Sequence, residues 1–172
     1  MLAGEAAGRG EEVADGMQAC ASLIADALPG LEEAVGRIAT TFAYVGRMYV
    51  IGRGIEFGTA REVALKLTET CRIAAEPVTS TDLAHGPIAA LDAMFPVWTI
   101  ASRDECLRAL VAAAALARKA GALLVATGNA AEEVPDASFR LPVPEAPLAV
   151  LSPLLSLVPA SCSLPHSRGR RA

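Results

Sequence analysis

Three charged side chains recur at helical spacing in the middle of the chain and could carry acid–base chemistry. Glu62, Lys66 and Glu69 are separated by four and then three residues, so they would share one face of a helix. A carboxylate presented in this way could move a proton between neighbouring carbon atoms, as enolisation of a sugar requires. The spacing also fits a solvated ladder of ion pairs, which from the residues alone is the simpler interpretation.

A histidine and a glycine-flanked arginine are the other candidates. His85 lies in a polar stretch, where an imidazole could act as acid or base in opening a sugar ring. Gly52-Arg53-Gly54 follows an apolar run, where backbone N–H groups could hold an anion. This is not a dinucleotide-binding fingerprint, because Phe57 occupies the position of the third glycine. Polar surface and a tight turn are the simpler explanations of the two segments.

Apolar runs that alternate with amphipathic segments predict the elements that position these residues. Strands are expected in the apolar run at 47–54, which ends in glycines and leads into a turn, and at 96–101, 122–129 and 138–143, the last at a sheet edge because it contains a proline. Thr59 and Glu62 fit a capping box that opens a helix to about residue 75, and Ser102 and Glu105 fit a second one. The alternation predicts an α/β fold, a three-layer αβα sandwich around a mostly parallel sheet.

The first 45 residues are expected to precede this domain as a leader and helices. Residues 1–16 are rich in Gly and Glu, and a helix over 17–28 would end at Pro29-Gly30. An apolar stripe from Leu31 to Val45 predicts a second helix. We expect this stripe and the uncharged segment 146–165 to leave apolar surface exposed on a lone domain and to drive self-association.

Composition excludes several classes of function. The chain has 172 residues, 53% of them hydrophobic, and therefore fits one folded domain with a core. A net charge of −4 without a basic stripe argues against a nucleic-acid partner. The prolines of the uncharged segment argue against a membrane span. The four cysteines are isolated, so we predict no metal site, no cofactor and a reducing, cytoplasmic location.

The segment from Tyr49 to Asp92 resembles the second sugar-isomerase (SIS) domain of glucosamine-6-phosphate synthase, the glutamine–fructose-6-phosphate aminotransferase family. The family pattern is roughly GRG, then ALEGALKLKE, then AEA, then GELKHGP. This chain supplies GRG at 52–54, ALKL at 64–67, Glu69, Ala75-Glu76 and HGP at 85–87, with no gap between Glu69 and His85. Weaker similarity extends the resemblance to about residues 45–160.

The resemblance implies site roles that the residues alone do not. Glu69 would correspond to the carboxylate that moves the proton between C1 and C2, and His85 to the ring-opening histidine that reaches the partner subunit's site. Glu62 matches an acidic position of the same helix, and Gly52-Arg53-Gly54 would contact the substrate. If so, Glu69 should face the crevice at the carboxyl ends of the strands, and His85 should point away from its own Glu69.

The same resemblance implies that parts of the family's site are lacking. The family's first SIS domain supplies Ser/Thr-rich loops that bind the sugar phosphate, and its tail ends in a conserved lysine. We therefore expect an SIS domain at 46–160 with a divergent, truncated or frame-shifted tail at 161–172. Such a chain should bind sugar phosphate weakly, as a homodimer or with a partner SIS domain, and catalyse little. A non-catalytic sugar-phosphate sensing or dimerisation module is the alternative.

Overall fold

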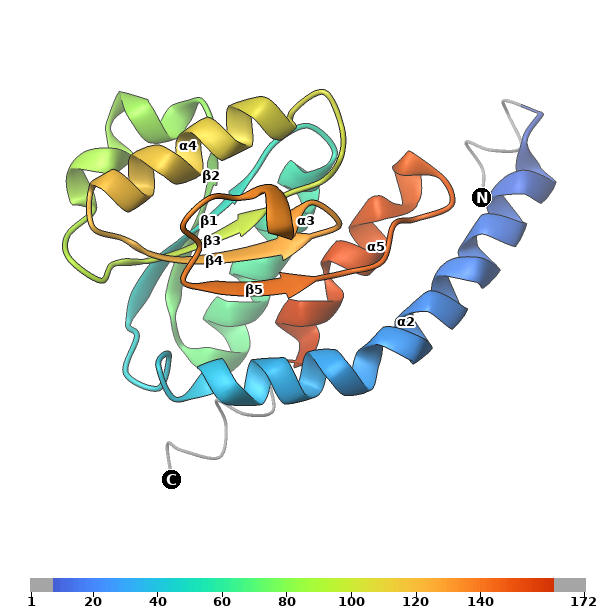
Figure 1. Cartoon of the computed structure of the whole chain (residues 1–172), viewed down its shortest axis with the longest axis horizontal. Helices are drawn as coiled ribbons and strands as arrows, with labels where there is room; N and C mark the ends of the chain where they lie inside the picture. Colours follow the sequence, from blue (N-terminus) through green and yellow to red (C-terminus); the bar gives the residue numbers. More distant parts are fainter. Residues whose placement is uncertain (1–7, 163–172) are drawn as a thin grey trace.

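Five parallel strands form the central sheet of the computed structural model, which describes residues 8–162 (Figure 1). The spatial order is β2-β1-β3-β4-β5, and every neighbouring pair is parallel. The strands are β1 (Arg47–Gly52), β2 (Ala74–Thr79), β3 (Pro96–Ile100), β4 (Leu123–Gly128) and β5 (Phe139–Pro142). This arrangement confirms the predicted α/β sandwich around a parallel sheet.

The strand that the sequence did not predict is β2, at one edge of the sheet. It contains Pro77, which cannot donate to a ladder and is therefore confined to edge strands or strand ends. Only Val78 of its six residues is buried, so no apolar run marks it. The predicted helix to residue 75 was wrong for this reason, and the opposite edge strand, β5, contains Pro142 as expected.

One long helix, α2 (Gly10–Ala39), replaces the predicted leader and two short helices. It continues through Pro29, although proline removes a helix hydrogen bond and typically bends the helix. Figure 1 shows α2 changing direction between its two halves. Burial on both sides of Pro29 explains why the helix persists, because Gly16 and Cys20 pack before it and Val35 packs after it.

The helix that carries the candidate carboxylates begins earlier than the capping box predicts. Helix α3 (Glu56–Lys66) starts three residues before Thr59, and a π-helical turn, η1 (Leu67–Cys71), extends it. The Thr59 hydroxyl donates to Glu56 Oε2 at 2.7 Å instead of capping the helix. The capping role predicted for Thr59 and Glu62 was therefore wrong.

Helix α4 (Leu107–Lys119), by contrast, begins later than its predicted capping box at Ser102. The Cys106 N–H, just before the helix, donates to Asp104 Oδ1 at 2.8 Å. The Asp104 carboxylate, and not the Ser102 hydroxyl, therefore accepts a backbone hydrogen bond at the start of the helix. The remaining elements are short: the 3₁₀ turns η2 (Asp82–His85), η3 (Pro87–Ala90), η4 (Ala131–Glu133) and η5 (Ala149–Leu151), and helix α5 (Ser152–Ser156).

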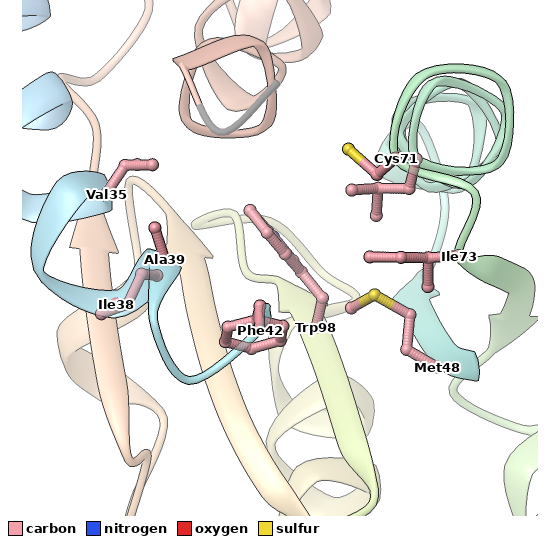
Figure 2. Close-up of a pocket in the computed structure, with 9 residues that line it drawn as sticks. Val35, Ile38, Ala39, Phe42, Met48, Cys71, Ile73 and Trp98 are labelled. Carbon is pink, nitrogen blue, oxygen red and sulfur yellow. The ribbon is translucent and has the colours of Figure 1, made fainter. Parts of the chain in front are cut away.

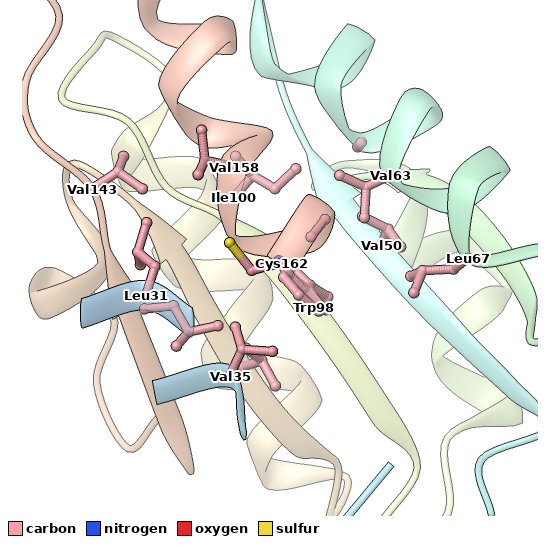
Figure 3. Packing of buried hydrophobic residues seen from close by; sticks show 14 of the residues in the cluster. Leu31, Val35, Val50, Val63, Leu67, Trp98, Ile100, Val143, Val158 and Cys162 are labelled. Atoms are coloured by element: carbon pink, nitrogen blue, oxygen red, sulfur yellow. The ribbon is translucent and has the colours of Figure 1, made fainter. Parts of the chain in front are cut away.

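Two apolar clusters cover the two faces of the sheet. On one face, α2, α3 and α5 pack over a cluster that includes Val50, Trp98 and Leu155 (Figure 3). On the other face, α4 and η2 pack over a cluster that includes Leu83 and Leu124. The helices therefore form the two outer layers of the sandwich.

The apolar stripe of the second half of α2 lies inside the first of these clusters. Leu31, Val35 and Ile38 are all buried against the sheet, and Phe42 and Val45 are partly buried there. The expectation that this stripe is exposed was wrong, because the chain's own sheet covers it. Self-association itself stays a prediction.

Two earlier expectations concern the ends of the chain and membrane association. Residues 1–7, and residues 163–172 of the predicted divergent tail, lie outside the described residues. Within residues 8–162, no helix combines the length and apolar composition that crossing a bilayer would require.

Candidate functional site

The turn formed by Gly52, Arg53 and Gly54 lies at the carboxyl end of β1. A Cβ at Gly52 would come within 2.4 Å of the Glu56 carbonyl oxygen, and Gly54 has a φ of +59°, so packing and backbone shape account for both glycines. The Arg53 guanidinium donates to Thr81 Oγ1 at 3.1 Å. A cavity of only about 10 Å³ lies between Arg53 and Glu56, which is space for a single water.

The predicted charged face of the helix is formed across α3 and η1. Lys66 Nζ lies 3.6 Å from Glu62 Oε1 and 3.8 Å from Glu69 Oε2. The Glu69 side chain is 54% exposed and the other two are 43% exposed, so all three carry their charge at the surface. One ammonium group therefore lies between two accessible carboxylates.

Glu69 lies in an uncommon backbone setting. It belongs to the π-helical turn η1, and such turns occur mostly as single interruptions of α-helices and often at functional sites. The turn ends at Arg72, which has a left-handed conformation with a φ of +57°. A non-glycine residue in this region costs free energy and persists where surrounding structure enforces it.

The structure places Glu69 at the amino-terminal edge of the sheet. Helix α3 follows β1 and η1 precedes β2, and the two strands are parallel, with Arg47 beside Ala74 at their starts. Since η1 ends three residues before β2 begins, Glu69 lies near the starts of the strands. The expectation that it faces the crevice at the carboxyl ends was wrong, because the helix has run antiparallel to the strands by that point.

His85 is exposed at the end of η2, on the other side of the sheet. Leu83, in the same turn, packs into the cluster under α4, whereas Leu67 and Cys71 of η1 pack into the cluster under α2. The sheet therefore separates His85 from Glu69 within one chain, and the chain does not bring the two residues together.

An apolar cavity of about 40 Å³ lies beneath η1 (Figure 2). Trp98 and Met48 from the sheet face Phe42 and the end of α2 across it, and Cys71 and Ile73 close it (Figure 2). The lining offers almost no polar groups, and the space holds only a few waters. A sugar beside Glu69 must therefore lie on the surface and not in this cavity.

A buried carboxylate that sequence reasoning missed lies at the opposite, carboxyl-terminal edge. Glu56, only 2% exposed, accepts three hydroxyl hydrogen bonds at Oε1, from Ser102 at 2.6 Å, Ser152 at 2.5 Å and Ser156 at 2.9 Å. Thr59 binds the other oxygen. The donors lie up to 100 residues away in sequence, so no local motif could have revealed this cluster.

A polar cleft of about 170 Å³ opens beside this cluster. Its lining comes from the segments that follow β1, β3, β4 and β5, and it includes Ser102, Arg103, Asp104, Asn129, Glu145 and Ser152. Among residues 8–162, no group of three or more His, Cys, Asp or Glu side chains is arranged to hold a metal ion.

Comparison with known proteins identifies related sequences. A model of the SIS domain matches residues 41–166. Glutamine--fructose-6-phosphate aminotransferase [isomerizing] of Shewanella oneidensis is 33% identical over 150 residues, which cover 86% of this chain and 24% of the relative. The chain therefore spans about a quarter of the length of the curated relatives that it matches.

Solved structures share the fold. The C-terminal domain of glucosamine-fructose-6-phosphate aminotransferase from Francisella tularensis superposes with a TM-score of 0.84 at 24% identity, covering 93% of this chain and 45% of that one. The Vibrio vulnificus NanR protein complexed with ManNAc-6P superposes with a TM-score of 0.67 at 18% identity, covering 90% of this chain and 62% of that one.

Proposed function

Because this chain belongs to the SIS domain family, we propose that it forms one half of a sugar-phosphate site and presents Glu69 to the sugar. The relative from Shewanella oneidensis is named for an activity on fructose 6-phosphate, and the NanR structure contains a sugar phosphate. A phosphorylated sugar is therefore the ligand class that we assign to this chain.

The observation that carries the proposal is the half-exposed Glu69 on a strained turn. π-helical turns and non-glycine residues in the left-handed region are both found frequently at functional sites, and the turn that carries Glu69 combines the two. Lys66, 3.8 Å away, supplies hydrogen-bond donors beside it for a sugar hydroxyl or a phosphate oxygen. In this role Glu69 would move a proton between neighbouring sugar carbons, and Glu62 would hold Lys66 in place.

The position of His85 supports a site shared between subunits. Since the sheet separates it from Glu69 in one chain, His85 can reach a sugar at Glu69 only from another copy. We therefore propose a homodimer, or a pair with another SIS domain, in which the histidine of each unit completes the sugar site of the other. The phosphate group would be bound by elements of that second domain.

The remaining sequence candidates receive structural roles in this proposal. We assign Gly52 and Gly54 to shaping the turn after β1, because a Cβ at either position would meet close neighbours.

We treat the SIS unit as residues 46–160, with α2 packed against its core. We also assign a cytoplasmic location, because the four cysteines are isolated in the sequence. Burial raises the pKa of the Cys20 and Cys162 thiols.

Calorimetric titration of the full chain with fructose 6-phosphate tests the proposal. We expect saturable binding in the millimolar range, weakened about tenfold in Glu69→Gln through the loss of a charged hydrogen bond. Glu33→Gln is the matched control, since Glu33 is also an exposed helical carboxylate in an ion pair, with Arg37, and should bind as the unsubstituted chain does. Undetectable binding, or equal binding by both variants, would overturn the proposal.

A deuterium-exchange experiment separates a catalytic role from sensing. Transfer of solvent deuterium to C1 of fructose 6-phosphate, followed by NMR, would show that Glu69 moves protons when both SIS domains of the site are present. Binding that depends on Glu69 without such exchange would instead identify a sensing or dimerisation module.

A further inference from the structure

The polar cleft at the carboxyl-terminal edge has the position and size of a small-molecule site. Its volume of about 170 Å³ is more than ten times the roughly 10–15 Å³ that one water needs by the same measure. In open α/β sheets, ligands bind beyond the carboxyl ends of the strands. Glu69 lies at the other edge, so this cleft is separate from the proposed sugar-phosphate half-site and does not depend on it.

The floor of the cleft can only accept hydrogen bonds. Ser102 and Ser152 line it and are 6% and 8% exposed. Each hydroxyl has a single hydrogen, and the two serines contact Glu56 Oε1, at 2.6 and 2.5 Å, and each other, at 3.0 Å, so both hydrogens are used within this cluster. The serine oxygens therefore turn lone pairs, and no donor, toward a ligand.

The walls add both acceptors and donors. One oxygen of Asp104 accepts the Cys106 N–H, which leaves the other oxygen available. The Asn129 side-chain oxygen accepts the Arg103 N–H, which leaves its amide NH₂ group as a donor. The Arg103 guanidinium is ion-paired with Glu133 at 2.8 Å and with Glu145 at 3.5 Å, which offsets its charge and leaves its other N–H groups as donors.

The charges around the cleft disfavour an anion. Asp104 and Glu145 line it, Glu133 neutralises Arg103, and the Glu56 carboxylate lies beneath the floor. The other nearby cation is Arg53, which lines the small cavity with Glu56 and donates to Thr81. Carboxylates therefore outnumber cations, and a phosphate would meet unpaired negative charge.

From this acceptor-rich, negatively charged lining we propose that the cleft binds a hydroxylated amine without a phosphate group. Such a molecule brings the ammonium and hydroxyl donors that the serine and carboxylate oxygens lack. Glucosamine is the probe that we choose for this class. Glucose lacks the charge, and glucose 6-phosphate has the wrong charge, so the two serve as comparison ligands.

Calorimetric titration of the full chain with the three sugars, with amide NMR shifts to locate binding, tests the proposal. Glucosamine should bind and shift the amides of Ser102–Asp104 and Asn129, glucose should bind about tenfold more weakly, and glucose 6-phosphate should leave these amides unchanged. Absence of glucosamine shifts at these residues, or equal binding of glucose 6-phosphate there, would overturn the proposal.

Substitutions separate this site from the one at Glu69. Asp104→Asn keeps the oxygen that accepts the Cys106 N–H but removes the charge, so glucosamine should bind about tenfold more weakly. Glu132→Gln, outside the cleft and paired with Arg140, is the matched control and should have no effect. Glu69→Gln should also leave glucosamine binding unchanged. Unaltered glucosamine binding by Asp104→Asn would contradict the assignment.

Discussion

The two edges of the sheet hold carboxylates of the same type in opposite surroundings. At the amino-terminal edge, Glu69 is 54% exposed and shares one ammonium group with Glu62. At the carboxyl-terminal edge, Glu56 is 2% exposed and bound by four hydroxyls, without an ion pair among the described residues. Exposure and hydrogen bonding, and not residue type, therefore decide which carboxylate is accessible to a ligand.

The energetics of the two edges differ accordingly. A buried charge is tolerated only when hydrogen bonds replace its lost hydration, and each donor to Glu56 then depends on that acceptor. Exposed ion pairs such as those of Lys66 contribute only about 0.2–1 kcal/mol. Substitution of Glu56 should therefore affect folding, and substitution of Glu69 should affect function.

The largest loss of stability is expected for Gly128→Ala, at the end of β4. Gly128 has a φ of +98°, and an added Cβ would lie 2.0 Å from the Ala101 carbonyl oxygen, so the backbone must move. We expect destabilisation of more than about 4 kcal/mol in urea unfolding, an exceptional value for a single substitution. Gly58→Ala, in α3 with open space around it, should instead stabilise by about 0.5–1 kcal/mol. Similar results for the two variants would show that close packing at the carboxyl-terminal edge does not limit stability there.

A smaller loss is expected for Glu56→Ala. The serine and threonine hydroxyls would keep their burial but lose their acceptor, at a cost of about 3 kcal/mol. Glu56→Gln retains one oxygen and should cost less. Chemical denaturation of both variants beside Glu62→Ala, which removes only an exposed pair, measures the difference. A Glu56→Ala protein as stable as Glu62→Ala would show that the hydroxyl cluster contributes nothing.

The smallest effects are expected for Glu69→Gln and His85→Ala. Both side chains are exposed, so each change should alter the free energy of unfolding by less than about 1 kcal/mol. Melting curves of the two variants against the unsubstituted chain give the measurement. Large destabilisation by both would mean that these residues are structural, and the two edges would then not differ as described.

Some parts of the fold follow from local patterns and others do not. The apolar runs at β1, β3 and β4 predict strands because these strands are fully or almost fully buried. β2 was missed because it is a half-exposed edge strand. The break predicted at Pro29 was wrong because tertiary packing on both sides of it outweighs the local cost.

The candidate site likewise has features that local spacing predicts and features that depend on the tertiary fold. The Glu62, Lys66 and Glu69 face depends only on helical spacing, and its charged groups lie together as that spacing predicts. The edge to which Glu69 belongs depends on the direction of α3 relative to the strands, which no local pattern contains. The Glu56 cluster joins α3, the end of β3 and α5, so only the folded chain brings its members together.

Amide NMR mapping of fructose 6-phosphate binding tests the central claim most directly, because it shows which edge meets the sugar phosphate. The account predicts shifts centred on residues 66–72, around Glu69, with none at Ser102–Asp104 or Asn129. Shifts confined to the carboxyl-terminal cleft, with residues 66–72 unchanged, would contradict it.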